Sequence, residues 1–377
     1  MPLSVRLIGP DTFGTMAAEW HDCLRQSEAH PLFMSWPWLF SWWETWSDEL
    51  ELELFLVGVF NDKNQLVGIG PFYRKDFVAP VGIRVRRLHL VGNAWHVAAT
   101  VRTEYCGLIV RKEYSNSACR AMLDFIGRFK WDEWVICDSL DSELEKIERT
   151  IENVGFKASK VVRSNDNGVK IDTTGSFSEW LDKLGKNTRL KVFNRWRYLQ
   201  GLGKLEIFPH SQIDFDEFLK QLNSFHVIRW GRPAFDELAV KFHRRLSCRL
   251  GSIGGRAECS MLFFKDECVS VLYDLVVDGQ RFNLQSGYIE NFDRKVSLGY
   301  LHLGLAIEKT FSDSGVFCYD LLAGAGKNQF YKSHFHGEGV RFNTMQWVRN
   351  PLLRYIYGVQ GALPNGLRRS INSWFRL

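Results

Sequence analysis

The sequence predicts a mixed α/β protein made of two halves with the same order of elements. The chain has 377 residues, more than one average domain, and 45% of them are hydrophobic, enough for substantial cores. Runs of β-branched and aromatic residues alternate with helical patterns in both halves. Each half also has one apolar strand holding a single acid, WVICDSL with Asp138 and FCYDLLAG with Asp320. These observations predict two tandem α/β domains with mixed sheets.

The first half opens with its most aromatic segment, residues 31–46. Ser35 suits a helix cap, and Trp38, Trp42 and Trp46 recur at helical spacing, so we expect a helix whose indoles are mainly core. A hairpin of LELFLVGVF and LVGIGPFYR follows. Further strands and two helices then lead through WVICDSL to a last strand, FKASKVV.

The domain junction is expected within residues 163–178, which are rich in Ser, Asn, Asp, Gly and Thr and hold one short strand, VKIDT. We therefore expect an N-terminal domain at 1–165, a C-terminal domain at 166–348 and a basic helical tail at 349–377. After Glu338 the chain has six arginines and no acid. Packing against the body and docking on an anionic membrane are both open for the tail.

A basic segment begins the second half. Residues 177–200 form one helical region, and residues 183–204 contain seven basic side chains and no acid. A solvated face is the simplest explanation. A cationic wall beside a charged substrate, or a contact with tRNA or a membrane, is the alternative.

Residues 268–336 predict the unit around which a site would form. Two strands meet at Asp278-Gly279, a polar loop follows, and a helix then runs to a stop at Gly315. A basic loop that opens a helix after a strand can bind an anion, because the first helical N–H groups have no partner. An ordinary loop with solvated charges is the other interpretation. The candidate anion-binding residues are Arg294, Lys295, Ser297, Leu298, Gly299 and Tyr300.

Composition and charge argue against several classes of protein. The net charge of +5 does not indicate a DNA-binding protein. The eight cysteines contain no CxxC pair and fit buried thiols in a reducing compartment. With no signal core and no membrane-spanning run, a cytoplasmic protein is expected. No group of residues has metal-ligand spacing, so no metal is expected.

Several motifs together resemble a known family. They are FMSWPWLFSWWETW, LVGIGPFYRK, TRLKVFNRWRYLQGLGKL, FHVIRWGRPAF and the run from SLGYLHLGLAIEK to YDLLAGAGKNQFYKSHF. In this order they resemble the CelD-like acetyltransferases, a branch of the GNAT acyltransferases found among bacterial cellulose and exopolysaccharide biosynthesis proteins. The Fem aminoacyltransferases are similar in architecture and pair two GNAT-type folds.

The resemblance implies acyl transfer from acetyl-CoA or another acyl-CoA to an amine or hydroxyl of a sugar or polysaccharide precursor. The chain departs from the usual acyl-CoA loop, because it keeps only Gly299 and places it later. Two alternatives therefore remain, a Fem-like transferase that uses aminoacyl-tRNA and a non-catalytic accessory protein of polysaccharide synthesis.

The resemblance also directs attention to groups that could move a proton. Asp320 in its apolar strand is the first candidate for the base, and His226 near a helix end is the second. Tyr331 is the candidate acid for the leaving thiolate. The candidate substrate-binding residues are Arg229, Trp230 and Lys332. Structural roles for each of them, in packing or ion pairs, stay open.

Overall fold

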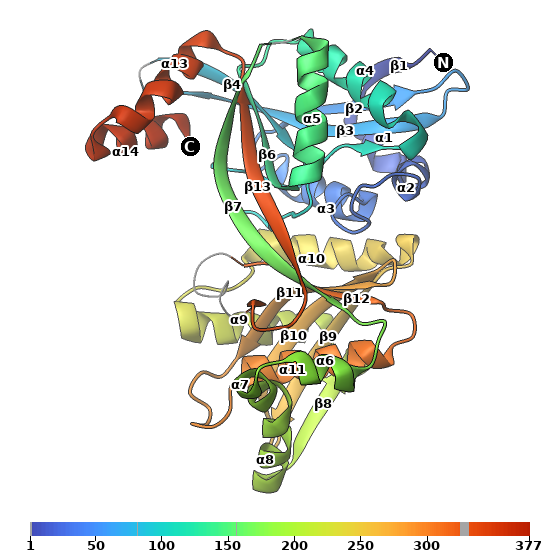
Figure 1. The fold of residues 1–377 in the computed structure, drawn as a ribbon, viewed down its shortest axis with the longest axis vertical. Coiled ribbons are helices and arrows are strands. Elements are labelled where there is room, and N and C mark those ends of the chain that lie inside the picture. The colour runs from blue at the N-terminus through green and yellow to red at the C-terminus, as the bar shows by residue number, and fades with distance from the viewer. Residues whose placement is uncertain (1, 81, 156, 325–331) are drawn as a thin grey trace. The chain divides into compact units, whose positions relative to one another are not determined.

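The protein divides into two compact units in a computed structural model that describes residues 2–80, 82–155, 157–324 and 332–377 (Figure 1). Unit 1 comprises Met1–Asp166 and Arg341–Leu377, and unit 2 comprises Asn167–Val340. The expected second domain extends to residue 348, with residues 349–377 as a separate tail. The structure instead groups residues 341–377 with unit 1.

Unit 1 contains a sheet in the order β1-β2-β3-β4-β6-β13-β7. Its first four strands form an antiparallel meander, β6 lies parallel to β4, and β13 lies antiparallel to β6. The strands are β1 (Ser4–Ile8), β2 (Glu53–Phe60), β3 (Leu66–Val78), β4 (Arg84–Leu90), β5 (Ile109–Val110), which pairs with β3, β6 (Glu133–Leu140) and β13 (Glu338–Val348).

The aromatic helix predicted near the N-terminus is confirmed as α3 (Trp36–Trp46). The Ser35 hydroxyl accepts the Trp38 N–H at 3.3 Å, and Trp38, Trp42 and Trp46 are buried. These indoles are therefore core residues. The other helices of unit 1 are α1 (Pro10–Thr15), α2 (Ala17–Arg25), α4 (Ser115–Gly127), α5 (Asp141–Val154), α13 (Pro351–Val359) and α14 (Asn365–Phe375).

Unit 2 repeats the same plan. An antiparallel meander β8-β9-β10-β11 leads to β12, which is parallel to β11, and β7 lies antiparallel on the far side of β12. The strands are β7 (Ser159–Asp172), β8 (Leu205–Pro209), β9 (Arg256–Phe264), β10 (Glu267–Val277), β11 (Gln280–Tyr288) and β12 (Cys318–Ala323). The repeated architecture expected from the sequence is confirmed.

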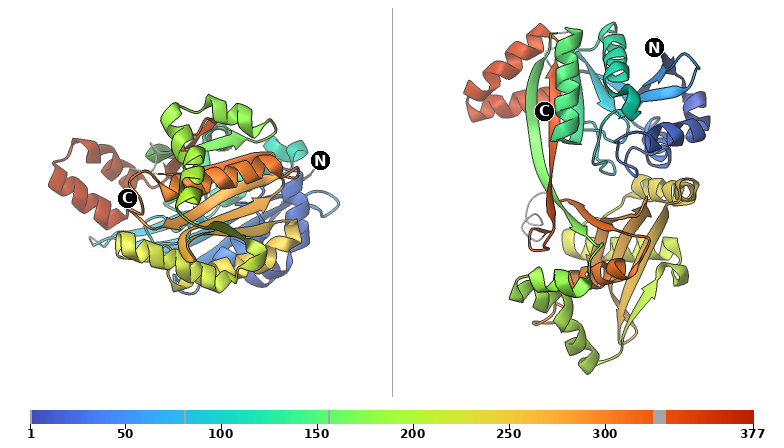
Figure 2. Two further views of the ribbon diagram at one scale, coloured as in Figure 1. Left: turned by 90° about the horizontal axis from the view of Figure 1, so that it is seen from below. Right: turned by 45° about the vertical axis from the view of Figure 1, so that its right-hand side comes forward.

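Helices cover both faces of the unit 2 sheet. Figure 2 shows α11 (Leu298–Ser312) on one face and α9 (Phe215–Trp230) on the other. The helix α10 is Glu237–Leu250. The helical region expected at 177–200 is broken into α6 (Phe177–Lys183), α7 (Lys186–Arg189), a wider π-type turn (Leu190–Asn194) and α8 (Arg195–Leu202). The break follows from the extended backbone of Leu184, which ends α6.

The expected junction loop is instead part of the long strand β7, which passes from unit 1 into unit 2. Its polar stretch forms a backbone ladder, and Lys170, Ile171 and Asp172 pair with β12. No helix among the described residues is long and apolar enough to span a membrane.

Candidate functional site

The candidate site lies where two parallel strands of unit 2 part. The strands β11 and β12 pair from Gln280↔Cys318 only as far as Phe282↔Asp320. Beyond this point the ladder between them stops, although β11 continues to Tyr288 and β12 to Ala323. The opening exposes strand backbone that β12 does not pair, which is a source of hydrogen-bond donors for a ligand.

The end of β12 is a fixed irregularity. Leu322 has a left-handed backbone with φ of 58°, and the ladder to β7 shifts register between Asp320 and Ala323. The fully buried Asp320 carboxylate accepts the Leu322 N–H at 2.8 Å, and Lys170 Nζ lies 3.9 Å from it. The Lys332 ammonium donates to the carbonyl oxygens of Leu321, Leu322 and Ala323 at 2.5, 2.9 and 2.7 Å. The Asp320 carboxylate and the Lys332 ammonium therefore stabilise this conformation at the end of β12.

His226 lies on the other side of the opening, near the end of α9. Its Nε2 is 2.9 Å from the carbonyl oxygen of Ser286 on β11, and since a carbonyl can only accept, Nε2 carries the proton. The lone pair is thus on Nδ1. Burial lowers the pKa of His226 below its ordinary value of 6.5, the Ser286 carbonyl opposes this, and Arg229 lowers the pKa further. The imidazole is therefore neutral near pH 7.

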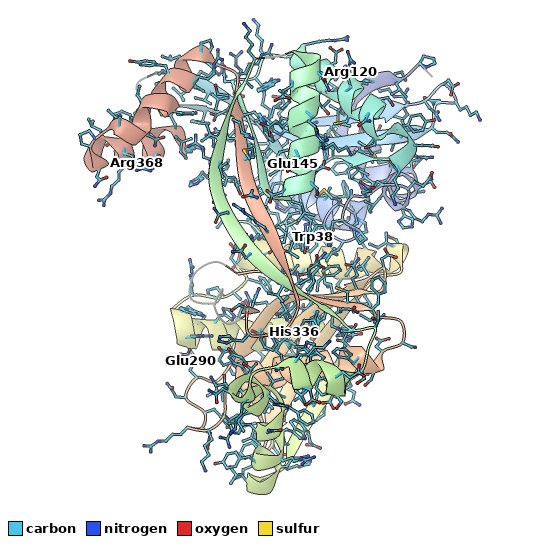
Figure 3. All side chains as sticks on the ribbon, viewed as in Figure 1. Trp38, Arg120, Glu145, Glu290, His336 and Arg368 are labelled. Atoms are coloured by element: carbon cyan, nitrogen blue, oxygen red, sulfur yellow. The ribbon has the colours of Figure 1, made fainter. Side chains whose placement is uncertain are left out.

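Arg229 connects the same helix to the end of β11. Its Nη1 donates to Tyr288 Oη at 2.8 Å, and its Nε lies 2.5 Å from Glu290 Oε1 (Figure 3, where Glu290 is labelled). Trp230, the last residue of α9, is exposed and lies against the same guanidinium. The residue types at 229 and 230 drew attention in the sequence, but Tyr288 and Glu290 did not, because nothing in the pattern links them to α9.

The polar loop forms a tight turn before α11. The Asp293 carboxylate accepts the Lys295 N–H at 2.7 Å, and the side chains of Arg294 and Lys295 are exposed. Ser297 is the cap residue, although its side chain makes no capping hydrogen bond, and Leu298 is buried.

Gly299 is in the first turn of α11, where a Cβ would lie 2.6 Å from Cε1 of Tyr288. The glycine therefore gives room to a tyrosine ring at this turn. Tyr300 follows it, with Oη 3.4 Å from His334 Nδ1, and burial, followed by the nearby Tyr288, raises the pKa of Tyr300.

The basic segment packs directly on α11. A Cβ on Gly304 would overlap the carbonyl oxygen of Val192, so the missing side chain allows the two backbones to touch. This contact brings the cations of the segment to the loop. Arg195 and Lys295 lie over the ring of Tyr198, at 5.7 and 5.1 Å from its centroid. Lys191 lies 5.3 Å from the centroid of the Tyr300 ring.

A buried hydrogen-bond chain behind β11 was not anticipated. His302 Nε2 is 2.8 Å from Ser260 Oγ, and His302 Nδ1 is 2.9 Å from Ser270 Oγ. Ser270 donates in turn to the Gly287 carbonyl oxygen at 3.2 Å. Burial lowers the pKa of His302 to about 3, so the ring stays neutral. The chain fixes the backbone of β11 within the parted region.

The corresponding opening in unit 1 is filled by its own chain. The strands β4 and β6 pair only through Arg87↔Glu133 and Leu88↔Trp134. Beyond them the segment Thr103–Cys106 is buried, and it bridges the two sides. Thr103 Oγ1 donates to the Gly92 carbonyl after β4, and the Cys106 N–H donates to the Asp138 carbonyl of β6 at 3.3 Å. We call this segment the plug.

Two further expectations from the sequence concern Tyr331 and a metal site. Tyr331 lies outside the described residues. Within the described part of the chain, no group of three His, Cys, Asp or Glu side chains could hold a metal ion.

Comparisons with known proteins agree with this geometry. Residues 186–333 match the family model for an acetyltransferase (GNAT) domain. A crystal structure of FemX is similar with a TM-score of 0.60 at 11% identity, covering 94% of this chain and 99% of FemX. The C-terminal domain of a putative lysylphosphatidylglycerol synthetase from Agrobacterium fabrum is similar with a TM-score of 0.51 at 10% identity, covering 92% and 95% of the two chains.

No curated protein matches the chain. The likeness to FemX extends over both units, while the match to the family model falls within unit 2, on the segment that holds the parted strands. The chain therefore has a GNAT-type fold, and the segment that matches the acetyltransferase domain model lies in unit 2.

Proposed function

We propose that unit 2 transfers an acyl group from acetyl-CoA or another acyl-CoA to an amine or hydroxyl of a sugar or polysaccharide precursor. The observation that carries the proposal is the parting of β11 and β12 after Phe282↔Asp320, directly before the loop and helix α11. A thioester placed in the opening would lie along strand backbone that β12 does not pair. Unit 1 would not share this activity, because the plug occupies its opening.

The donor's diphosphate would bind at the loop before α11. Arg294 and Lys295 are exposed there, and Arg195 reaches the same tyrosine ring from the basic segment. Cations from two elements that converge on one spot fit a doubly charged group better than one loop alone. The residues present thus suit a CoA diphosphate, even though the loop has a single glycine, Gly299, in the first turn of α11.

The chemistry needs a base, and His226 suits it better than Asp320. The Asp320 carboxylate is fully buried and engaged with the Leu322 N–H, while the Nδ1 lone pair of His226 is on a half-buried ring beside β11. In the proposed step, the acceptor nitrogen or oxygen attacks the thioester carbon, and its proton passes to Nδ1. The C–S bond then breaks and the CoA thiolate takes a proton, for which Tyr331 remains the candidate donor.

The acceptor would approach along the end of α9. Trp230 is exposed, as flat aromatic side chains that stack on sugar rings commonly are, and Arg229 is held in place by Glu290 and Tyr288. Lys332 is a weaker candidate for this task, since its ammonium already donates to three carbonyls.

Binding of CoA provides the test. The double substitution R195E/K295E should weaken CoA binding at least tenfold, about 1.4 kcal/mol, by isothermal titration calorimetry at fixed salt. The matched control is Lys112→Glu, an exposed lysine in the 3₁₀ turn that precedes α4 in unit 1. It should leave the dissociation constant unchanged.

The outcomes separate the alternatives. Equal CoA affinity in the wild type and R195E/K295E would contradict the donor site. Binding of tRNA in place of CoA, with a steep salt dependence lost in R195E/K295E, would favour the aminoacyl-tRNA reaction. No thermal shift with any acyl-CoA or tRNA would favour the non-catalytic accessory protein.

A further inference from the structure

The two C-terminal helices are a fixed part of unit 1. Arg87, almost completely buried, donates from Nη2 to the Phe375 carbonyl at 2.6 Å and from Nη1 to the Arg376 carbonyl at 3.0 Å. These carbonyls end α14, where a cation is favoured. In α13, Tyr357 donates to the buried Glu133 at 2.9 Å. The inner faces of both helices are thus held by buried charged groups.

The outer faces of the same helices carry large apolar side chains in solvent. Tyr355 is 69% exposed, Leu367 53%, Leu352 49% and Trp374 36%. Leu352 and Tyr355 are three residues apart, and Leu367 and Trp374 are seven apart, so each pair shares one helix face. Exposed apolar side chains gathered in this way mark an interaction surface.

Arginines accompany these side chains. Arg354 is in α13, and Arg368 and Arg369 are in α14, with Arg368 projecting outward (Figure 3). No ion pair to these three is found among the described residues, and the sequence has no acid after Glu338. Their charge is therefore available to an anionic partner.

We propose that the outer face of α13 and α14 docks on an anionic lipid bilayer. Leucine, tyrosine and tryptophan beside arginine suit the boundary between headgroups and acyl chains, and each arginine near an anionic surface contributes about 1 kcal/mol. A nucleic acid would neutralise the arginines but would leave Leu352 and Leu367 in water. The proposal does not depend on the reaction proposed for unit 2.

Sedimentation with vesicles tests the surface. The full-length protein should pellet with phosphatidylcholine vesicles that contain phosphatidylglycerol, and at least tenfold less with phosphatidylcholine alone. The triple substitution R354Q/R368Q/R369Q should lower the partition into anionic vesicles at least tenfold. Substitutions are preferred to deletion of the tail, which would take the Phe375 and Arg376 carbonyls from the buried Arg87 and the Tyr357 hydroxyl from the buried Glu133.

The matched control removes the same charge elsewhere on unit 1. K63Q/K112Q/K157Q changes three exposed lysines outside the tail and should pellet like the wild type. A second variant, L352S/L367S, keeps every charge and should also bind more weakly, which separates insertion from simple charge attraction. Circular dichroism melts check that all variants fold.

Three outcomes would overturn the proposal. They are equal pelleting of the arginine and lysine triple variants, partition that ignores the lipid charge, and a self-association without vesicles that the arginine triple variant abolishes. The last would assign the surface to a second copy of this chain.

Discussion

The openings in the two units start from the same backbone plan and end differently. In both, a meander strand and a parallel crossover strand pair briefly and then part. In unit 1 the chain between β4 and β5 is long, residues 91–108, and it supplies the plug. In unit 2 only residues 289–297 separate β11 from α11, and they form a turn that carries Arg294 and Lys295. The difference shows that the connecting segment, more than the sheet, decides whether such an opening is filled.

The two parallel crossover strands, β6 and β12, each hold one aspartate, Asp138 and Asp320, at an irregular point of the strand. Asp138 has a left-handed backbone, with φ of 44°, and Arg102 binds both of its carboxylate oxygens at 2.8 and 2.6 Å. Arg102 also binds Asp166 at 2.9 Å. Asp320 instead folds onto the N–H of Leu322, and Leu322 takes the left-handed conformation. Each aspartate stabilises an irregular strand, Asp138 through the Arg102 guanidinium and Asp320 through the Leu322 N–H, with Lys170 nearby.

The largest expected effect comes from removing the plug's aromatic ring. Tyr105 stacks on His30 with centroids 4.2 Å apart and packs edge-on against Phe342 at 4.7 Å. Tyr105→Ala should lower the free energy of unfolding by about 3 kcal/mol or more, because the buried ring leaves a cavity. Urea unfolding measures this, with Tyr355→Ala on the exposed face of α13 as a control that should change it by less than about 0.5 kcal/mol. Equal effects would show that the plug is not core.

The second largest effect should come from removing the proposed base, His226. His226→Gln keeps a side-chain N–H for the Ser286 carbonyl but loses the proton acceptor, so kcat for CoA release should fall about hundredfold with little change in the melting temperature. The exposed His210→Gln in the same unit is the control. Full turnover in His226→Gln together with loss in Asp320→Asn would return the proton transfer to Asp320.

A substitution at the close contact between α11 and the basic segment should have a smaller effect on stability. Alanine in a helix is ordinarily more stable than glycine by about 1 kcal/mol. Gly304→Ala should nevertheless destabilise unit 2 by about 2 kcal/mol, because its Cβ would overlap the Val192 carbonyl. Gly201→Ala in α8, where nothing lies within 4 Å of the new Cβ, should be neutral or stabilising. A stabilising Gly304→Ala in thermal unfolding would refute the contact.

The smallest effect is a shift in the pH profile. The base works when neutral, and the pKa of His226 is lowered from 6.5, so activity should be full at neutral pH and lost only in more acidic solution. The positive charge of Arg229 opposes protonation of the ring. Arg229→Gln should therefore raise the pKa of His226 and move the acid limb of the kcat/KM profile to higher pH by a few tenths of a unit. Arg232→Gln should leave the limb where it is. A limb that moves to lower pH would contradict the stated electrostatics.

The sequence predicted elements whose side chains carry the signal. The spacing of Trp38, Trp42 and Trp46 defined α3, and the Asp278-Gly279 turn joined β10 to β11, where both residues have positive φ. The two ends of β7 were predicted as separate strands, FKASKVV and VKIDT. The polar stretch between them was taken for a loop, because backbone hydrogen bonds form the ladder and leave its sequence unconstrained. The helix stop expected at Gly315 was also wrong, since α11 ends at Ser312.

The candidate site could be proposed from residue types, but its contacts could not be predicted from the sequence. His226, Arg229 and the loop cations were expected from their chemistry. Their partners Ser286, Tyr288 and Glu290 come from elements distant in sequence, and no local pattern reports such pairs. The chain of His302 with two serines was invisible for the same reason, because a histidine in an apolar helix looks like ordinary core.

The order in which the chain enters and leaves unit 2 has a consequence for its synthesis. Unit 1 needs residues 341–377, so a ribosome must synthesise all of unit 2 before β6 can pair with β13. Unit 2 can finish first, and the nascent N-terminal part waits with an open strand edge that invites misassociation. A stop codon that removes residues 341–377 should therefore damage the part of the protein that was made earliest.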